Sequence, residues 1–182
     1  MIVNIFTDGS VIGYKKYARG GIGAVIDYND RRIDTVKISE PFFNYPITAP
    51  RTEFYAIIRS LIVLLNDSNL LKRIKIVNIY SDNNNVQMTM NEWIHAWRNR
   101  GWKKYDGSEP ENLDLIQYLD FIRNLFAKKR KEVNFYFVKG HRNRPKLDHR
   151  SAEYKIWDGN RIADLLAKKG TNMAIKYFKF NI

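Results

Sequence analysis

Residues 2–10, IVNIFTDGS, set the architecture that we expect for the whole chain. The first half is typical of a buried strand, because Val3 and Ile5 fall on one face among β-branched and aromatic residues. The second half would place the carboxylate of Asp8 where the strand ends and the backbone turns. A buried carboxylate is costly unless a cation or hydrogen-bond donors neutralise it. Asp8 is therefore either a turn residue bonded to its own backbone or a metal ligand, and this stretch alone leaves both interpretations open.

Length and composition indicate one folded domain. The 182 residues can bury their own core, and contents of 45% hydrophobic and 14% aromatic residues favour a globular protein. There are no cysteines, so disulfides, cysteine-zinc sites and thiol catalysis are excluded. The start is too short for a signal peptide, and the longest apolar run, residues 61–65, is far shorter than a membrane span. We therefore expect an intracellular, cytoplasmic protein that works away from membranes.

Charge is the most informative bulk property. The net charge is +12 and the pI is about 9.8, and this balance favours a polyanionic partner, nucleic acid first and an anionic membrane surface second. The basic residues cluster at 15–19, 98–104, 128–131 and 139–146. The run at 128–131, taken alone, is better explained as a solvated helix face.

A second carboxylate follows a second strand. Residues 22–28 and 31–38 predict a hairpin around Asn29-Asp30, which gives an antiparallel half-sheet. Residues 74–80 predict a fourth strand that is reached through an amphipathic helix starting at Pro50, so it should pair in parallel with the first strand. It ends in Ser81-Asp82-Asn83, and neighbouring parallel strands bring Asp8 and Asp82 to the same edge of the sheet. This juxtaposition favours the metal-ligand interpretation of Asp8.

Two predicted helices carry further carboxylates. Glu53 lies one turn inside the helix that starts at Pro50, on its buried flank, where it is either solvated at the edge or directed at a site beneath the sheet. In the last helix, Asp158 resembles an N-cap, Gly170 lies past the end, and Asp164 sits among small and apolar residues. Four carboxylates form an oxygen-only donor set that suits Mg²⁺ or Mn²⁺ rather than zinc. Two such ions are the standard arrangement for in-line attack on a phosphodiester.

Residues 93–104, WIHAWRNRGWKK, interleave tryptophans with arginines and lysines. Core tryptophans would explain one of the three. The whole pattern fits better with a protruding basic arm whose rings stack on sugars or bases while its cations meet phosphates. The candidate nucleic-acid-binding residues of this arm are Trp93, Trp97, Arg98, Arg100, Trp102 and Lys103.

The rest of the chain predicts a helix at 113–126, a fifth strand at 133–138, and a basic run to Arg150 that we expect to be flexible. The tail at 173–182 fits either a last strand or a loosely packed extension. We find no internal repeat and no coiled-coil pattern, so we expect a monomer.

In order and wording, these motifs resemble the ribonuclease H type 1 family over nearly the whole chain. The resemblance is carried by Thr7-Asp8-Gly9-Ser10, Arg51-Thr52-Glu53-Phe54, Tyr80-Ser81-Asp82-Asn83, Val138-Lys139-Gly140-His141 and residues 159–167. Residues 93–103 resemble the basic protrusion of bacterial members. The resemblance implies an α/β ribonuclease H-like fold, a five-stranded mixed sheet flanked by helices. It also implies one domain over residues 1–182, with the protrusion at about 91–105 and a C-terminal extension at 171–182.

The activity that the resemblance implies is endonucleolytic hydrolysis of the RNA strand of RNA–DNA hybrids, leaving 5′-phosphate and 3′-hydroxyl ends. Two Mg²⁺ ions, or Mn²⁺, would be held by Asp8, Glu53, Asp82 and Asp164, the last chosen over Asp158 by the family motif. His141 would assist proton movement or product release, with a phosphate contact as the alternative. Thr48 would lie near a DNA phosphate, and Asn84 stands where the family has a glutamine.

The chain departs from the family where asparagines read the RNA 2′-hydroxyl. At the positions of those asparagines this chain has Tyr14 or its neighbours and Ala49-Pro50. The 2′-hydroxyl is the group that distinguishes RNA from DNA. The segment at 142–158 is also longer than in bacterial members. Two alternatives stay open. The altered 2′-hydroxyl readers favour a nuclease of the same fold that acts on DNA or structured nucleic acid. An inactive hybrid-binding module is the other, and the presence of all four carboxylates disfavours it.

Overall fold

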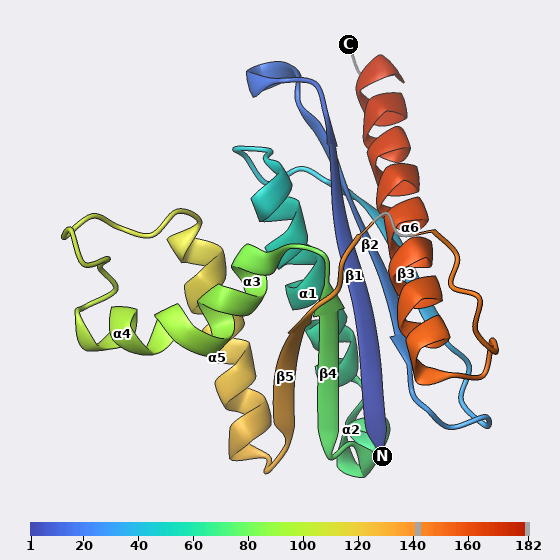
Figure 1. Cartoon of the computed structure of the whole chain (residues 1–182). Coiled ribbons are helices and arrows are strands. Elements are labelled where there is room, and N and C mark those ends of the chain that lie inside the picture. The colour runs from blue at the N-terminus through green and yellow to red at the C-terminus, as the bar shows by residue number, and fades with distance from the viewer. Residues whose placement is uncertain (141–142, 181–182) are drawn as a thin grey trace.

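A five-stranded mixed sheet forms the centre of the structure, in the order β3-β2-β1-β4-β5 (Figure 1). The computed structural model describes residues 1–140 and 143–180. Its strands are β1 (Ile2–Ile12), β2 (Arg19–Asp27), β3 (Val36–Phe42), β4 (Ile76–Ser81) and β5 (Glu132–Phe137). β2 pairs antiparallel with both β1 and β3, whereas β4 pairs in parallel with both β1 and β5. The predicted five-stranded mixed α/β sheet is confirmed.

Helices connect and cover these strands. They are the 3-10 turn η1 (Lys15–Tyr17), α1 (Ala49–Asn66), α2 (Ser68–Arg73), α3 (Asn84–Met88), the π-helical turn η2 (Thr89–Trp93), α4 (Ile94–Asn99), α5 (Leu113–Lys128) and α6 (Ala152–Phe180). α1 packs on β1 and β2 and also contacts α5, while α6 lies along β1, β2 and β3. α3, η2 and α4 lead away from the sheet as an arm (Figure 1). No helix within the described ranges is both long and apolar enough to span a membrane.

Two hydrophobic clusters fill the two sides of the sheet. The larger one contains Val3 and Ile5 of β1 together with the apolar side of α1, as their alternation predicts. The smaller one contains Phe6, Val25 and Ala163, and it lies under α6. The first strand is therefore buried on both faces, which holds the backbone around Asp8 in a fixed position.

β1 is longer than predicted. We expected the strand to end near Phe6 and the chain to turn at Asp8, but β1 continues to Ile12, and Asp8 pairs with Gly23 of β2. Pairing with β2 stabilises this second half of β1. The local sequence does not predict the extension. The turn interpretation of Asp8 is wrong. The hairpin of β2 and β3 is confirmed with shifted bounds, and α1 begins one residue before Pro50.

α6 is also longer than predicted. It begins at Ala152, so Asp158 is not its N-cap, and it continues through Gly170 to Phe180, so the tail is helical up to that residue. Gly170 serves close packing instead of termination, because a Cβ there would collide with the carbonyl oxygen of Glu40 in β3. Ala163, Ala167 and Ala174 are buried on the same helix. This small-residue face lets α6 lie close to the sheet.

Candidate active site

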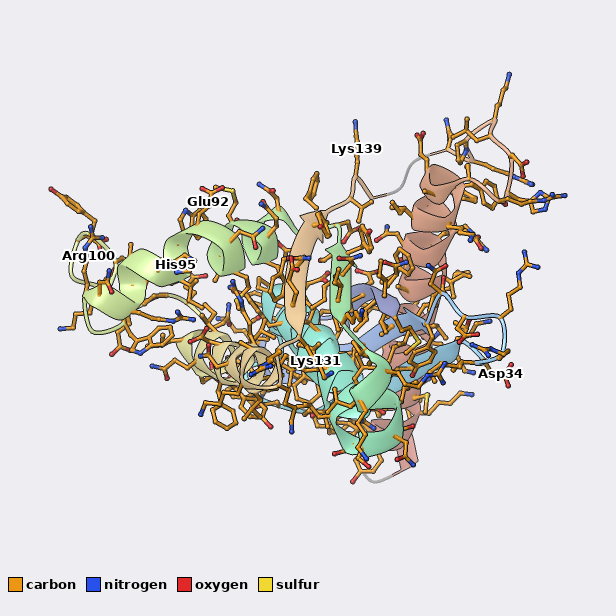
Figure 2. The ribbon with its side chains drawn as sticks, turned by 90° about the horizontal axis from the view of Figure 1, so that it is seen from below. Asp34, Glu92, His95, Arg100, Lys131 and Lys139 are labelled. Atoms are coloured by element: carbon orange, nitrogen blue, oxygen red, sulfur yellow. The ribbon has the colours of Figure 1, made fainter. Side chains whose placement is uncertain are left out.

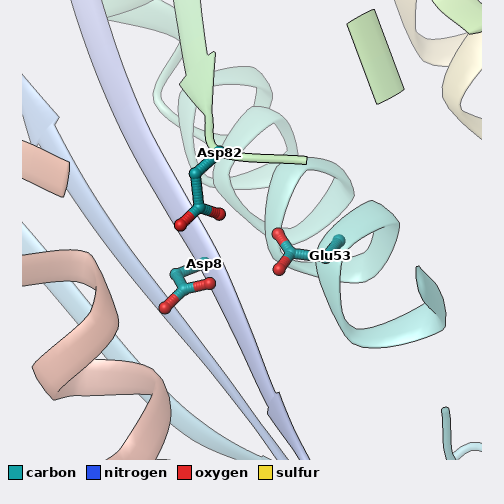
Figure 3. Close-up of side chains that lie close together, drawn as sticks. All are labelled: Asp8, Glu53 and Asp82. Carbon is teal, nitrogen blue, oxygen red and sulfur yellow. The ribbon is translucent and has the colours of Figure 1, made fainter. Parts of the chain in front are cut away.

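Three carboxylates converge at one edge of the sheet (Figure 3). Asp8 comes from β1, Asp82 follows the end of β4, and Glu53 comes from the first turns of α1. One oxygen of each lies within 4.8 Å of one oxygen of each of the others. We call these three residues the carboxylate triad.

The strand register explains why the two aspartates meet. The parallel pairing of β1 with β4 ends at Thr7 opposite Ser81, so the next residue on each strand is an aspartate. β1 continues beyond this point with β2 alone. The prediction that both aspartates would lie at a common edge is confirmed, although only β4 ends there.

A glycine lets α1 approach the strand. A Cβ at Gly9 would collide with the side chain of Thr52 and lie 2.7 Å from the backbone nitrogen of Glu53. The absence of that atom allows the start of α1 to contact β1, and it brings Glu53 beside Asp8. Glu53 is therefore buried at the site instead of solvated at the helix edge.

Burial and mutual repulsion make the triad electrostatically unfavourable without a cation. Asp8 and Glu53 are each only 7% exposed. Burial, followed by the charge of Asp82, raises the pKa of Asp8 from 3.8 to about 7. Burial, followed by the charge of Asp8, raises the pKa of Glu53 well above its usual value. The backbone N–H of Gly9 donates to Oδ1 of Asp8 at 2.8 Å and opposes part of this effect.

The triad fits a hard divalent cation. Its donors are all carboxylate oxygens, the ligands that Mg²⁺ and Mn²⁺ prefer. Oε2 of Glu53 is buried and has no hydrogen-bond partner among the residues that the structure describes. A buried anionic oxygen beside two other carboxylates is balanced most simply by a bound cation.

Asp164 lies beside the triad and is not one of the three. It lines a cavity of about 290 Å³ together with Asp82, Val138, Lys139, Glu153, Ile156, Trp157, Asn160 and Arg161. Its charge contributes to the raised pKa of Asp8, so the two carboxyl groups interact. Its Oδ2 accepts a hydrogen bond from Nζ of Lys168 at 2.7 Å. The structure thus brings the fourth predicted carboxylate to the same cavity as Asp82.

The histidine loop is described only in part. Gly140 packs against Asp82, because a Cβ at this glycine would collide with the aspartate carboxylate. The backbone at Gly140 therefore lies against the site. His141, which the family motif predicts as a proton-moving group, lies outside the described residues.

The basic arm projects from the body of the protein, with Glu92, His95 and Arg100 along it (Figure 2). Trp93 is 38% exposed and its ring lies 5.8 Å from that of Trp97. Trp97 and Trp102 are partly buried against the main core. These two tryptophans therefore fit the interpretation as core residues better than the interpretation as rings that stack on nucleic acid.

One cation of the arm forms an ion pair inside the protein, and others are exposed at the surface. Arg98 forms a two-bond ion pair with the buried Asp120 of α5, which ties the arm to the domain. Arg100 lies over the ring of Tyr105 at 5.5 Å, and Lys103 is exposed. Trp93, Arg100 and Lys103 are therefore the residues of the predicted set that are best exposed for a nucleic acid.

Thr48 and Asn84 are exposed at the starts of α1 and α3, the helices that begin closest in sequence to Glu53 and Asp82. Backbone N–H groups at helix N-termini attract phosphate, so both positions suit contacts with a nucleic-acid backbone. The adjacent Arg51 has a structural task, because its buried guanidinium forms two hydrogen bonds with Asp114 of α5, at 2.8 and 2.7 Å.

Sequence reasoning missed Asn160, a buried polar residue in the wall of the cavity. It precedes Asp164 by four residues, so the two share one face of α6. That spacing was visible in the sequence, but an asparagine inside a helix carries no chemical signal until its burial is known.

The fold and the triad together define a metal-dependent nuclease of ribonuclease H-like architecture. A family model described as RNase H matches residues 1–172, and the chain belongs to the ribonuclease H family. Its function is endonucleolytic hydrolysis of the RNA strand of RNA–DNA hybrids, a metal-dependent reaction in this family.

Relatives agree with this assignment, and solved structures agree with the fold. A ribonuclease H of Cupriavidus metallidurans is 34% identical over 168 residues, which cover 92% of this chain and 94% of the relative. LC9-RNase H1, a type 1 RNase H with the type 2 active-site motif, has a similar fold, with a TM-score of 0.69 at 22% identity over 95% of this chain and 73% of its own. A foamy viral protease-reverse transcriptase in complex with an RNA/DNA hybrid gives a TM-score of 0.63 at 20% identity, over 93% of this chain and 20% of its own.

Proposed function

We propose that the carboxylate triad holds two divalent cations, Mg²⁺ or Mn²⁺, with Asp164 as a further ligand from the side of the cavity. The observation that carries this proposal is that Asp8 and Glu53 are buried together. Oε2 of Glu53 also has no hydrogen-bond partner among the described residues. Like charges at this separation favour proton uptake or cation binding over the ionised metal-free state.

The bound ions would activate water and stabilise the leaving oxygen during in-line displacement at phosphorus. Asp8 and Asp82, placed by the register of β1 and β4, fix the position of that chemistry relative to the sheet. Water attacks the phosphorus, the bond to the 3′-oxygen breaks, and the products carry a 5′-phosphate and a 3′-hydroxyl. The protein supplies positioning and fixed negative charge, which are the main contributions to phosphoryl transfer catalysis.

We further propose how this chain binds the RNA–DNA hybrid duplex. The starts of α1 and α3 flank the triad in sequence and would meet the phosphates of the two strands. The arm, which carries Arg100 away from the body of the protein (Figure 2), would extend the contact through this residue and the exposed Trp93 and Lys103. A net charge of +12 supports a polyanionic partner. We propose that one domain over residues 1–182 acts as a monomer.

The test is a panel of end-labelled duplexes of one sequence, made as RNA–DNA, RNA–RNA and DNA–DNA, each with Mg²⁺ or with EDTA. Wild type should cut only the RNA strand of the hybrid, only with the metal, and leave 5′-phosphate ends. Asp82→Asn should bind the hybrid and leave it intact. Asp34→Asn, an exposed substitution in the loop between β2 and β3 (Figure 2), should cut like wild type. Cleavage of the DNA duplex at a comparable rate would contradict the proposed substrate.

A further inference from the structure

Asn160 has a buried side-chain oxygen that plays no part in the proposed set of metal ligands. It lies on α6 one turn before Asp164 and lines the 290 Å³ cavity. The residue is only 8% exposed, and its side-chain oxygen has no hydrogen-bond partner among the described residues. A buried amide oxygen without a donor is unfavourable. This oxygen is therefore suited to accept a hydrogen bond from a molecule that occupies the cavity.

The cations that the structure describes around the cavity are directed elsewhere. Arg161 donates two hydrogen bonds to Asp158, at 3.0 and 2.7 Å, and Lys168 donates to Asp164. The side chain of Lys139 extends outward from the end of β5 (Figure 2). The three acidic residues in the wall, Asp82, Glu153 and Asp164, are acceptors when ionised and do not supply the missing donor. No described residue donates to this oxygen, so a ligand in the cavity is a suitable donor.

We infer that Oδ1 of Asn160 accepts a hydrogen bond from a water molecule bound to the divalent cation on the side of Asp82 and Asp164. Mg²⁺ keeps several of its waters when proteins bind it, and each water is a hydrogen-bond donor. Partners in this outer position orient the inner ligands and tune metal affinity. Asn160 is thus a positioning residue that acts through water, and this inference rests on the proposed function.

The size of the cavity agrees with a hydrated ion. A water molecule takes up about 30 Å³ in the liquid, so a cavity of about 290 Å³ has room for several waters beside the carboxylates. The amide of Asn160 and the carboxylate of Asp164 lie on the same face of α6. This helix can therefore present both a carboxylate and a neutral acceptor to the hydration shell of one ion.

The experiment is calorimetric titration of the full chain with Mn²⁺ at pH 8, without nucleic acid, alongside thermal unfolding of each variant in EDTA. Asn160→Leu removes the acceptor at similar volume and should weaken the metal affinity about 10-fold without lowering Tm. Asn160→Asp restores an acceptor and should bind Mn²⁺ at least as tightly as wild type. Asn160→Ala gives the same comparison if leucine does not fit.

Thr171→Val is the matched control on the same helix. The Thr171 hydroxyl is buried and bonded to the carbonyl oxygens of Ser10 and Ala167, at 3.0 and 3.2 Å. Its loss should lower Tm and leave the Mn²⁺ affinity unchanged, the opposite pattern to Asn160→Leu.

Equal Mn²⁺ affinity of wild type and Asn160→Leu would overturn the inference while leaving the proposed metal site intact. A higher KM for the hybrid in that variant would then assign the Asn160 oxygen to the nucleic acid. Failure of wild type to bind Mn²⁺ at all would contradict the proposed function, and the inference would fall with it.

Discussion

Replacing Asp8 with asparagine should make the metal-free protein more stable at pH 8 while it abolishes cleavage. The native fold raises the pKa of Asp8 from 3.8 to about 7, through burial and the neighbouring charges of Asp82 and Asp164. Between these two pH values the native state binds more protons than the unfolded chain, so the stability must fall as pH rises. Above the native pKa, the free energy of unfolding is lowered by the full cost of ionising this buried carboxyl group.

The magnitude follows from the pKa values. Each unit of pKa difference corresponds to about 1.4 kcal/mol, so a rise from 3.8 to about 7 destabilises the metal-free native state by up to about 4 kcal/mol at pH 8. Asparagine removes the charge and keeps an oxygen that accepts the N–H of Gly9. We expect Asp8→Asn to gain about 1–3 kcal/mol over wild type at pH 8, since the remaining carboxyl groups relax in part.

The assay is urea unfolding in EDTA at pH 5 and pH 8 for wild type, Asp8→Asn and the exposed control Asp34→Asn. Wild type and the control should lose stability between the two pH values, and Asp8→Asn should lose less. Adding Mg²⁺ at pH 8 should stabilise wild type and not Asp8→Asn, because only a competent site gains binding energy on folding. An Asp8→Asn protein that is less stable than wild type at pH 8 in EDTA would refute the electrostatic reasoning.

Three further substitutions separate structural from substrate-binding roles. Arg98→Ala removes the ion pair of the buried Asp120 and leaves its carboxylate only a 3.5 Å hydrogen bond from Asn124, so it should cost about 2–3 kcal/mol in urea unfolding. An unchanged unfolding midpoint would show that Arg98 has no structural role. Gly23→Ala adds a Cβ that collides with Ala163 in α6, so we expect a Tm at least 5 °C lower from scanning calorimetry, and normal thermal unfolding would contradict the close packing. Trp93→Ala should raise the KM for the hybrid several-fold at unchanged Tm, and a lowered Tm with normal KM would make it a core residue.

The pair of Asp8 and Asp82 could be predicted because the physical rule behind it is simple. Parallel neighbours in a sheet bring residues of matching register to one edge, whatever the rest of the fold does. The two carboxylates meet even though β1 does not end at Asp8. The local sequence could not show this, because the extra strand length depends on pairing with β2.

Features that depend on contacts between distant segments were misread. Asp158 and Gly170 have the residue types of helix caps, but both lie inside α6, where packing against the sheet keeps the chain helical. Arg98 has the character of a phosphate ligand and instead pairs with a buried aspartate. The orphaned oxygen of Asn160 is a property of burial, which no sequence pattern around it reports.

The central claim is that the carboxylate triad binds the catalytic metal, and anomalous diffraction from crystals soaked in Mn²⁺ tests it most directly. We expect anomalous peaks about 2.1 Å from carboxylate oxygens of Asp8, Glu53 and Asp82, and their loss in Asp8→Asn crystals. Peaks confined to other parts of the surface, in a protein that still cuts the hybrid with Mn²⁺, would contradict it.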